Sequence, residues 1–186
     1  MKQLLFLMML PCVCFAQRKA TVMSPVTSKD DIAVANGPSV PMKKGSVFYE
    51  YIDSSFKKEK PDVYKAAKLW FADFFKDSKT VLQVDDKNLG ELVGKGNFPF
   101  SVTYNGADMG CMCQFTVKIS CRKDRYRIQI YDISTKADNE DGFTSVDGLV
   151  KTDDGFGQRV LRQVDEDISG IIQSSRRAIA EQTDTF

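Results

Sequence analysis

The chain has 186 residues, the length of one ordinary domain with short extensions. Hydrophobic residues make up 42% and charged residues 27%, which is typical of a globular protein and excludes a fibrous or disordered one. The 26 basic and 25 acidic side chains nearly cancel, so bulk charge favours neither nucleic acid nor an anionic membrane as a partner. The chain has no histidine, which excludes His-dependent triads and the commonest metal ligand.

Residues 1–16, MKQLLFLMMLPCVCFA, are typical of a secretory signal peptide. Lys2 provides the positive start, an apolar run follows, and Ala16 is the small residue before the cleavage point. The apolar run is too short to span a bilayer, which takes roughly 20 residues, so we expect no transmembrane segment. A lipoprotein signal is the alternative because Cys12 and Cys14 could carry lipid, but neither follows the small residue that such signals use. We therefore expect a periplasmic or secreted protein.

Residues 17–45 are polar, contain three prolines and show no sustained periodicity, which indicates an extended lead or linker. A single domain is expected over residues 46–182, followed by a tail at 183–186. SVFYEYID (46–53) is rich in aromatic and β-branched residues and predicts a strand. Apolar residues at three- and four-residue steps between 62 and 77 predict a helix, with Pro61 at its first turn.

Residues 80–98 predict a hairpin with a turn at 85–90, and the glycines at 94 and 96 suggest a bulge or a bend in its second strand. A loop containing Asn105, Gly106 and Gly110 is expected next. Residues 111–121 and 125–133 alternate between apolar and polar side chains, so they predict one antiparallel hairpin with a core face and a solvent face. Residues 134–158 are expected to form a loop with room for one short extra element, and the apolar stripe of residues 158–182 predicts a final helix.

The order strand, helix, four strands, helix predicts a two-layer α+β domain, in which an antiparallel sheet carries two helices on one face. Cys111, Cys113 and Cys121 all fall on the apolar face of one predicted strand and are interpreted as small buried hydrophobic residues. Asp85 and Asp86 are neighbours in a strand and face opposite ways, so they do not form a catalytic carboxylate pair. We expect no metal ion and no cofactor.

A long string of residues in this chain resembles the signature of a bacterial family of exported proteins of unknown function with a fold like that of the TATA-box-binding protein (TBP). The similarity extends over roughly residues 46–133 and is carried by Ala67, Lys68, Trp70, Val81, Gln83, Asp85, Asp86, Gly90, Val93, Gly94, Lys95, Gly96, Phe98, Lys123, Asp124, Arg125, Tyr126, Arg127 and Asp132. The resemblance implies a TBP-like β-α-β(4)-α fold with a curved antiparallel sheet. It does not imply DNA binding, because the chain is nearly neutral.

The polar face of the sheet is the first candidate for a binding surface. It is predicted to display Thr116, Lys118, Arg127, Gln129 and Tyr131, side chains suited to an unidentified envelope protein or a small polar ligand. We expect reversal of the charges of Lys118 and Arg127 to abolish binding without lowering the melting temperature. The basic turn at 122–125 is either a solvated hairpin end or a contact for an anion or a partner.

Two other functions remain open at the level of sequence. A carrier of an apolar small molecule would hold it between the sheet and the C-terminal helix, in a cavity lined by residues such as Phe115, Ile128 and Ile172. An enzyme would need a site without histidine, assembled from distant residues, and no spacing in the chain indicates one. The favoured prediction is a non-catalytic binding module of the cell envelope.

Overall fold

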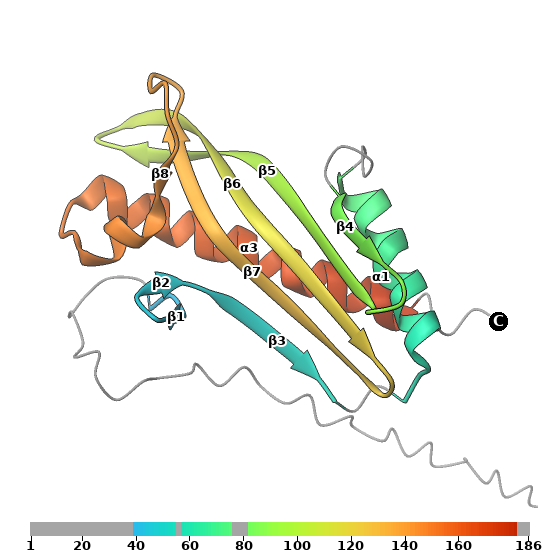
Figure 1. The fold of residues 1–186 in the computed structure, drawn as a ribbon. Helices are drawn as coiled ribbons and strands as arrows, with labels where there is room; N and C mark the ends of the chain where they lie inside the picture. The colour runs from blue at the N-terminus through green and yellow to red at the C-terminus, as the bar shows by residue number, and fades with distance from the viewer. Residues whose placement is uncertain (1–38, 55–56, 76–81, 182–186) are drawn as a thin grey trace, which may run out of the picture.

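The computed structural model describes residues 39–54, 57–75 and 82–181, so the predicted signal peptide, most of the lead segment and the tail lie outside the described residues. Its centre is a six-stranded sheet with strand order β3-β7-β6-β5-β4, with β8 paired to β7, and every pairing is antiparallel (Figure 1). The strands are β3 (Tyr49–Asp53), β4 (Leu82–Asp86), β5 (Glu91–Tyr104), β6 (Ala107–Arg122), β7 (Arg125–Ala137) and β8 (Thr144–Ser145).

Two tight turns join the three long central strands. Asn105 and Gly106 link β5 to β6 with φ angles of 51° and 80°, a left-handed backbone that asparagine and glycine adopt readily. The loop expected to include Gly110 is therefore shorter than predicted, because Gly110 already pairs with Ser101 between β5 and β6. At the other end, Lys123 and Asp124 connect β6 to β7.

Helices α1 (Lys60–Phe75) and α3 (Gly155–Glu181) pack on one face of the sheet, which we call the inner face, and Figure 1 shows α3 running behind the strands. Their apolar stripes meet the alternating apolar residues of β5, β6 and β7, which bury together in one core. Fully buried members of that core include Phe71, Leu92, Phe115, Ile119, Ile128, Ile130, Leu161, Ile168 and Ile179. The predicted order of strands and helices is confirmed.

The glycines of β5 have a packing role. A Cβ atom at Gly96 would collide with the rings of Phe75 and Phe115, so the absence of a side chain lets these rings lie against the strand.

The predicted bulge lies on the neighbouring strand: Leu82 pairs with Gly94 and Val84 with Val93, which leaves one extra residue on β4. A second irregularity in β7 contains Asp132, at φ 52°.

Two boundaries differ from the sequence-based expectation. The expected linker ends in a small hairpin of β1 (Met42–Lys43) and β2 (Ser46–Val47), and Val40 is buried, so the ordered unit begins before residue 46. The expected loop at 134–158 contains the end of β7, the strand β8 and the 3-10 helix η1 (Val146–Lys151). Asp147 of η1 accepts a hydrogen bond of 2.7 Å from the Val47 amide, a long-range contact that sequence periodicity cannot show.

The three cysteines of β6 are buried and free, which confirms their interpretation as core residues. Burial raises the pKa of the Cys113 and Cys121 thiols to about 12, so both stay protonated at neutral pH.

Candidate functional site

The face of the sheet opposite the helices, which we call the outer face, is the candidate binding surface. Figure 1 shows both helices on the far side of the strands from it. Backbone register aligns the outward side chains in rows across the strands, with Lys118 beside Gln129 and Thr116 beside Tyr131. The structure therefore brings the five predicted surface residues together on one face, as strand alternation requires.

Thr116 is the exception among the five as a contact residue. Its side chain is only 4% exposed, because the neighbouring strands carry longer side chains around it, so it cannot present a surface to a partner. Tyr131 is half-buried and its ring stacks on that of Phe48, with centroids 6.0 Å apart and planes 22° apart. That stack forms an aromatic rim at one end of the outer face.

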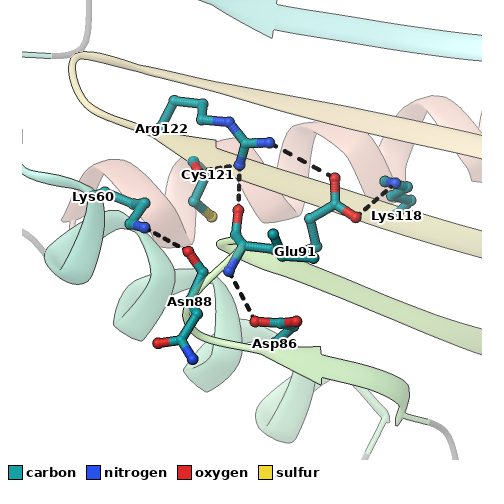
Figure 2. Close-up of polar contacts among 8 residues, drawn as sticks. Lys60, Asp86, Asn88, Glu91, Lys118, Cys121 and Arg122 are labelled. Atoms are coloured by element: carbon teal, nitrogen blue, oxygen red, sulfur yellow. Dashed lines mark hydrogen bonds and ion pairs between the residues drawn. The ribbon is translucent and has the colours of Figure 1, made fainter.

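Lys118 and Arg122 of β6 share the carboxylate of Glu91 on β5. The Lys118 ammonium lies 2.9 Å from one oxygen of Glu91, and an Arg122 guanidinium nitrogen lies 3.9 Å from the other (Figure 2). The same guanidinium donates to the backbone carbonyls of Leu89 and Cys121, the latter at 2.9 Å. Arg122 is thereby held to the β4–β5 turn in a fixed orientation.

A second shared carboxylate lies on β3, an edge strand of the sheet. Glu50 of β3 accepts a hydrogen bond of 2.7 Å from the Gln129 side chain. Nitrogens of Lys43 and Arg127 lie 3.8 Å and 3.9 Å from the same oxygen. Each of the two carboxylates is thus shared by two cations, and Lys95 and Arg125 have no ion pair among the described residues. The outer face consequently has a surplus of positive charge.

Sequence reasoning missed the two glutamates that organise this surface. Glu50 alternates with the buried Tyr49 and Tyr51, so its outward direction was available from the strand pattern of β3. Glu91 begins the long strand β5 and faces outward beside Ser120 of β6. Which strands would be neighbours, and hence which cations these carboxylates meet, depends on the sheet order.

The outer face also carries exposed apolar side chains at its two edge strands. Ile52 on β3 is 49% exposed and Val84 on β4 is 41% exposed. Near the β6–β7 turn a cavity of about 230 Å³ opens on this face, lined by Ile52, Ser120, Arg122, Arg125, Tyr126 and Arg127. Two residues of the predicted basic turn, Arg122 and Arg125, therefore line a concave surface.

Asp85 and Asp86 face in different directions, as their adjacent positions in a strand predict. Asp85 points to the inner side, where it accepts hydrogen bonds from the Tyr64 hydroxyl and, at 2.6 Å, from the Lys68 ammonium, both on α1. Asp86 accepts a hydrogen bond of 2.8 Å from the Leu89 amide inside the β4–β5 turn (Figure 2). Both carboxylates hold the fold together and neither forms a paired acid–base site.

The interior positions considered for a carrier are packed into the core. Phe115, Ile128 and Ile172 are at most 3% exposed and belong to one continuous apolar cluster. Neither the cavity on the outer face nor one of about 330 Å³ along α3 includes them.

Within the described ranges, no group of three or more Cys, Asp or Glu side chains is placed to bind a metal ion. In the same part of the chain, no helix has the length and apolar character needed to cross a membrane.

Comparison with known proteins gives a match to one family model and a similar fold. Residues 48–136 match the family model described as a domain of unknown function (DUF4468) with TBP-like fold. The crystal structure of a DUF4468 family protein from Bacteroides ovatus superposes with a TM-score of 0.63 at 13% identity, covering 75% of this chain and 90% of that chain. A TBP-like protein from Parabacteroides distasonis gives a TM-score of 0.55 at 16% identity, covering 74% and 97%. The sequence has no match among curated proteins.

Proposed function

We propose that this chain, whose residues 48–136 match the DUF4468 family model, is a non-catalytic module of the bacterial cell envelope. It binds a negatively charged partner through the outer face of its sheet. One observation carries this proposal: the helices leave the outer face uncovered, and its carboxylates Glu50 and Glu91 are each shared by two cations. A face with a surplus of cations favours acidic partners and steers their approach.

The other features of the face support a macromolecular partner. Interfaces combine apolar and aromatic side chains with a polar rim. The outer face offers the exposed Ile52 and Val84 and the Phe48–Tyr131 stack beside its charged rows. Glu91 holds Lys118 and Glu50 holds Gln129, so a partner meets these two side chains in fixed positions and little of their side-chain entropy is lost on binding.

Export and the absence of catalysis belong to the same proposal. The predicted signal peptide at residues 1–16 supports an envelope location, either periplasmic or secreted. The matched family is one of unknown function, and the chain has no histidine, which removes the commonest general base. Intact-mass measurement on protein from the envelope fraction of its own host tests export: cleavage after Ala16 is expected, and an uncleaved chain would contradict it.

Site-specific photo-crosslinking in the native host tests the binding surface. A photoreactive residue placed at Val84 or Lys95, both outward on the sheet, is expected to give one discrete cross-linked product. The same residue placed at Arg162, exposed on α3, is the matched control and is expected to give none. Lys95→Glu should suppress the cross-link formed at Val84, whereas Arg162→Glu should leave it unchanged. Equal cross-linking from both layers, or no effect of Lys95→Glu, would contradict the proposed surface.

A further inference from the structure

The cavity at the β6–β7 end of the outer face has an unusual lining. Arg122, Arg125 and Arg127 all line it, together with Ile52, Ser120 and Tyr126, and no carboxylate lies among these described lining residues. Its volume of about 230 Å³ is several times the roughly 30 Å³ that one water molecule occupies in the liquid. The space is therefore sufficient for a small anionic group that keeps part of its hydration.

Ser120 is the observation that points to a ligand. Its side chain is 5% exposed, it lines the cavity, and its Oγ has no hydrogen-bond partner among the described residues. Buried hydroxyl groups are nearly always hydrogen-bonded, because leaving one without a partner costs folding free energy. A bound acceptor would supply the missing partner once the Ser120 hydroxyl turns toward the cavity that its residue lines.

The three arginines are placed where they repel one another. Arg122 and Arg125 are directly opposite each other across the β6–β7 ladder, and Arg127 is the next outward residue along β7. Like charges directly opposite in a sheet are destabilising. Arg125 has no ion pair among the described residues, and the nearest carboxylate oxygens to Arg122 and Arg127 are 3.9 Å away, beyond hydrogen-bonding distance.

The arginines also differ in a way that suits binding. Arg122 is fixed by two backbone carbonyls, so it provides a preorganised wall of the cavity. Arg125 is exposed at the start of β7, and no ion pair among the described residues holds its guanidinium. Guanidinium groups have several N–H donors in a planar fork that matches the oxygens of phosphate, and they remain charged at any physiological pH.

We propose that this cavity binds a phosphate group, with Arg122, Arg125 and Arg127 as its cationic contacts and the Ser120 hydroxyl as a neutral donor. A tetrahedral oxyanion offers oxygens in several directions at once, as three guanidinium groups from two strands require, whereas a carboxylate offers two oxygens in one plane. The inference rests on the proposed function of the outer face and names the chemistry that the negatively charged partner would present there.

Calorimetric titration of the full chain with inorganic phosphate at constant ionic strength tests the site. Saturable binding is expected for the wild-type protein, with acetate binding more weakly at the same concentration. Arg125→Gln should weaken phosphate binding about tenfold or more, since a charged hydrogen bond is lost. Ser120→Ala should weaken it severalfold and leave the melting temperature unchanged or raised, because it removes a buried hydroxyl without a partner. Arg162→Gln on α3 is the matched control and should bind as the wild type does.

Two results would overturn the proposal: no saturable binding of phosphate, or binding that survives both Arg125→Gln and Ser120→Ala, which would indicate an adventitious ion only. Glycerol 3-phosphate and dimethyl phosphate distinguish the sources of the group. Tighter binding of the former supports a terminal phosphate, and equal binding of both supports a bridging phosphodiester. Failure of the phosphate titration while cross-linking at Val84 and Lys95 persists would remove the phosphate site alone and leave the proposed function standing.

Discussion

The hydroxyl of Tyr64 on α1 donates its hydrogen to Asp85 on β4, and this bond joins the first helix to an edge strand of the sheet. Lys68, one turn further along α1, donates to the other oxygen of the same carboxylate at 2.6 Å. Asp85 thereby ties α1 to β4, the elements that come before and after residues 76–81 in the sequence.

Removing the phenol should weaken this link. We expect Tyr64→Phe to lower the free energy of unfolding by about 1 kcal/mol, the loss of one hydrogen bond to a partly exposed carboxylate. Urea titration followed by circular dichroism measures it. Tyr104→Phe is the matched control, because the Tyr104 hydroxyl has no hydrogen bond among the described residues and should lose almost nothing. Equal losses in the two variants would contradict the assigned role of Tyr64.

The same carboxylate makes stability depend on pH. The hydrogen bonds from Lys68 and Tyr64 hold the pKa of the Asp85 carboxyl below its ordinary value. Its stabilising contribution is therefore fully present above the unfolded pKa of about 3.9 and is lost as the pH falls through the lower folded pKa. We expect Asp85→Asn to be less stable than the wild type near neutral pH and the two to converge in acid. A difference that does not change with pH would contradict the shift.

Gly96 should tolerate no side chain while Phe75 and Phe115 keep their places. Gly96→Ala is expected to cost about 1–3 kcal/mol, because the added methyl overlaps both rings. Combining it with Phe75→Leu should restore part of the loss, since the smaller side chain leaves room, and a double-mutant cycle measures this coupling. Gly142→Ala is the matched control: nothing lies within 4 Å of its added Cβ, and its stability should be close to wild type.

Charge reversal at Lys118 should destabilise the protein. The expectation that Lys118 and Arg127 could be reversed without affecting the melting temperature does not fit the structure, because Lys118 lies 2.9 Å from Glu91. Lys118→Glu would place two carboxylates together and is expected to cost about 1 kcal/mol. Lys95→Glu makes the same change of charge at an exposed position without an ion pair among the described residues, so its melting temperature should stay at the wild-type value. Thermal unfolding measures the melting temperatures of both variants, and an equal change in the two would contradict the role assigned to the Lys118–Glu91 pair.

The cysteines should be inert in the native protein. Burial raises the pKa of the Cys113 and Cys121 thiols to about 12, which leaves almost no reactive thiolate at neutral pH. Alkylation with iodoacetamide followed by peptide mapping is expected to leave both unmodified until urea is added. Rapid labelling of either thiol in native buffer would show that β6 opens locally.

The order of the main elements was predictable from sequence because each element carries its own period. Alternation along β6 and β7 and the three- and four-residue spacing in α1 and α3 assign their faces without knowledge of the neighbours. The small hairpin at residues 42–47 was not predictable, since it is too short to show a period and depends on the contact between Val47 and Asp147. The candidate surface was likewise only partly predictable: alternation indicated the outward residues, but Thr116 is covered by its neighbours.

Composition and periodicity are enough to show the lack of histidine, the alternating strands and the amphipathic helices. They also predict the outward direction of Lys118, Arg127, Gln129 and Tyr131. Three contacts become visible only in the folded sheet: Glu91 lies between Lys118 and Arg122, Glu50 meets Gln129 and Arg127, and Ser120 is buried among arginines. The reason is physical: periodicity depends on residues a few positions apart, whereas charge pairing depends on which strands are neighbours and in what register, and that is fixed by burial of the whole inner face.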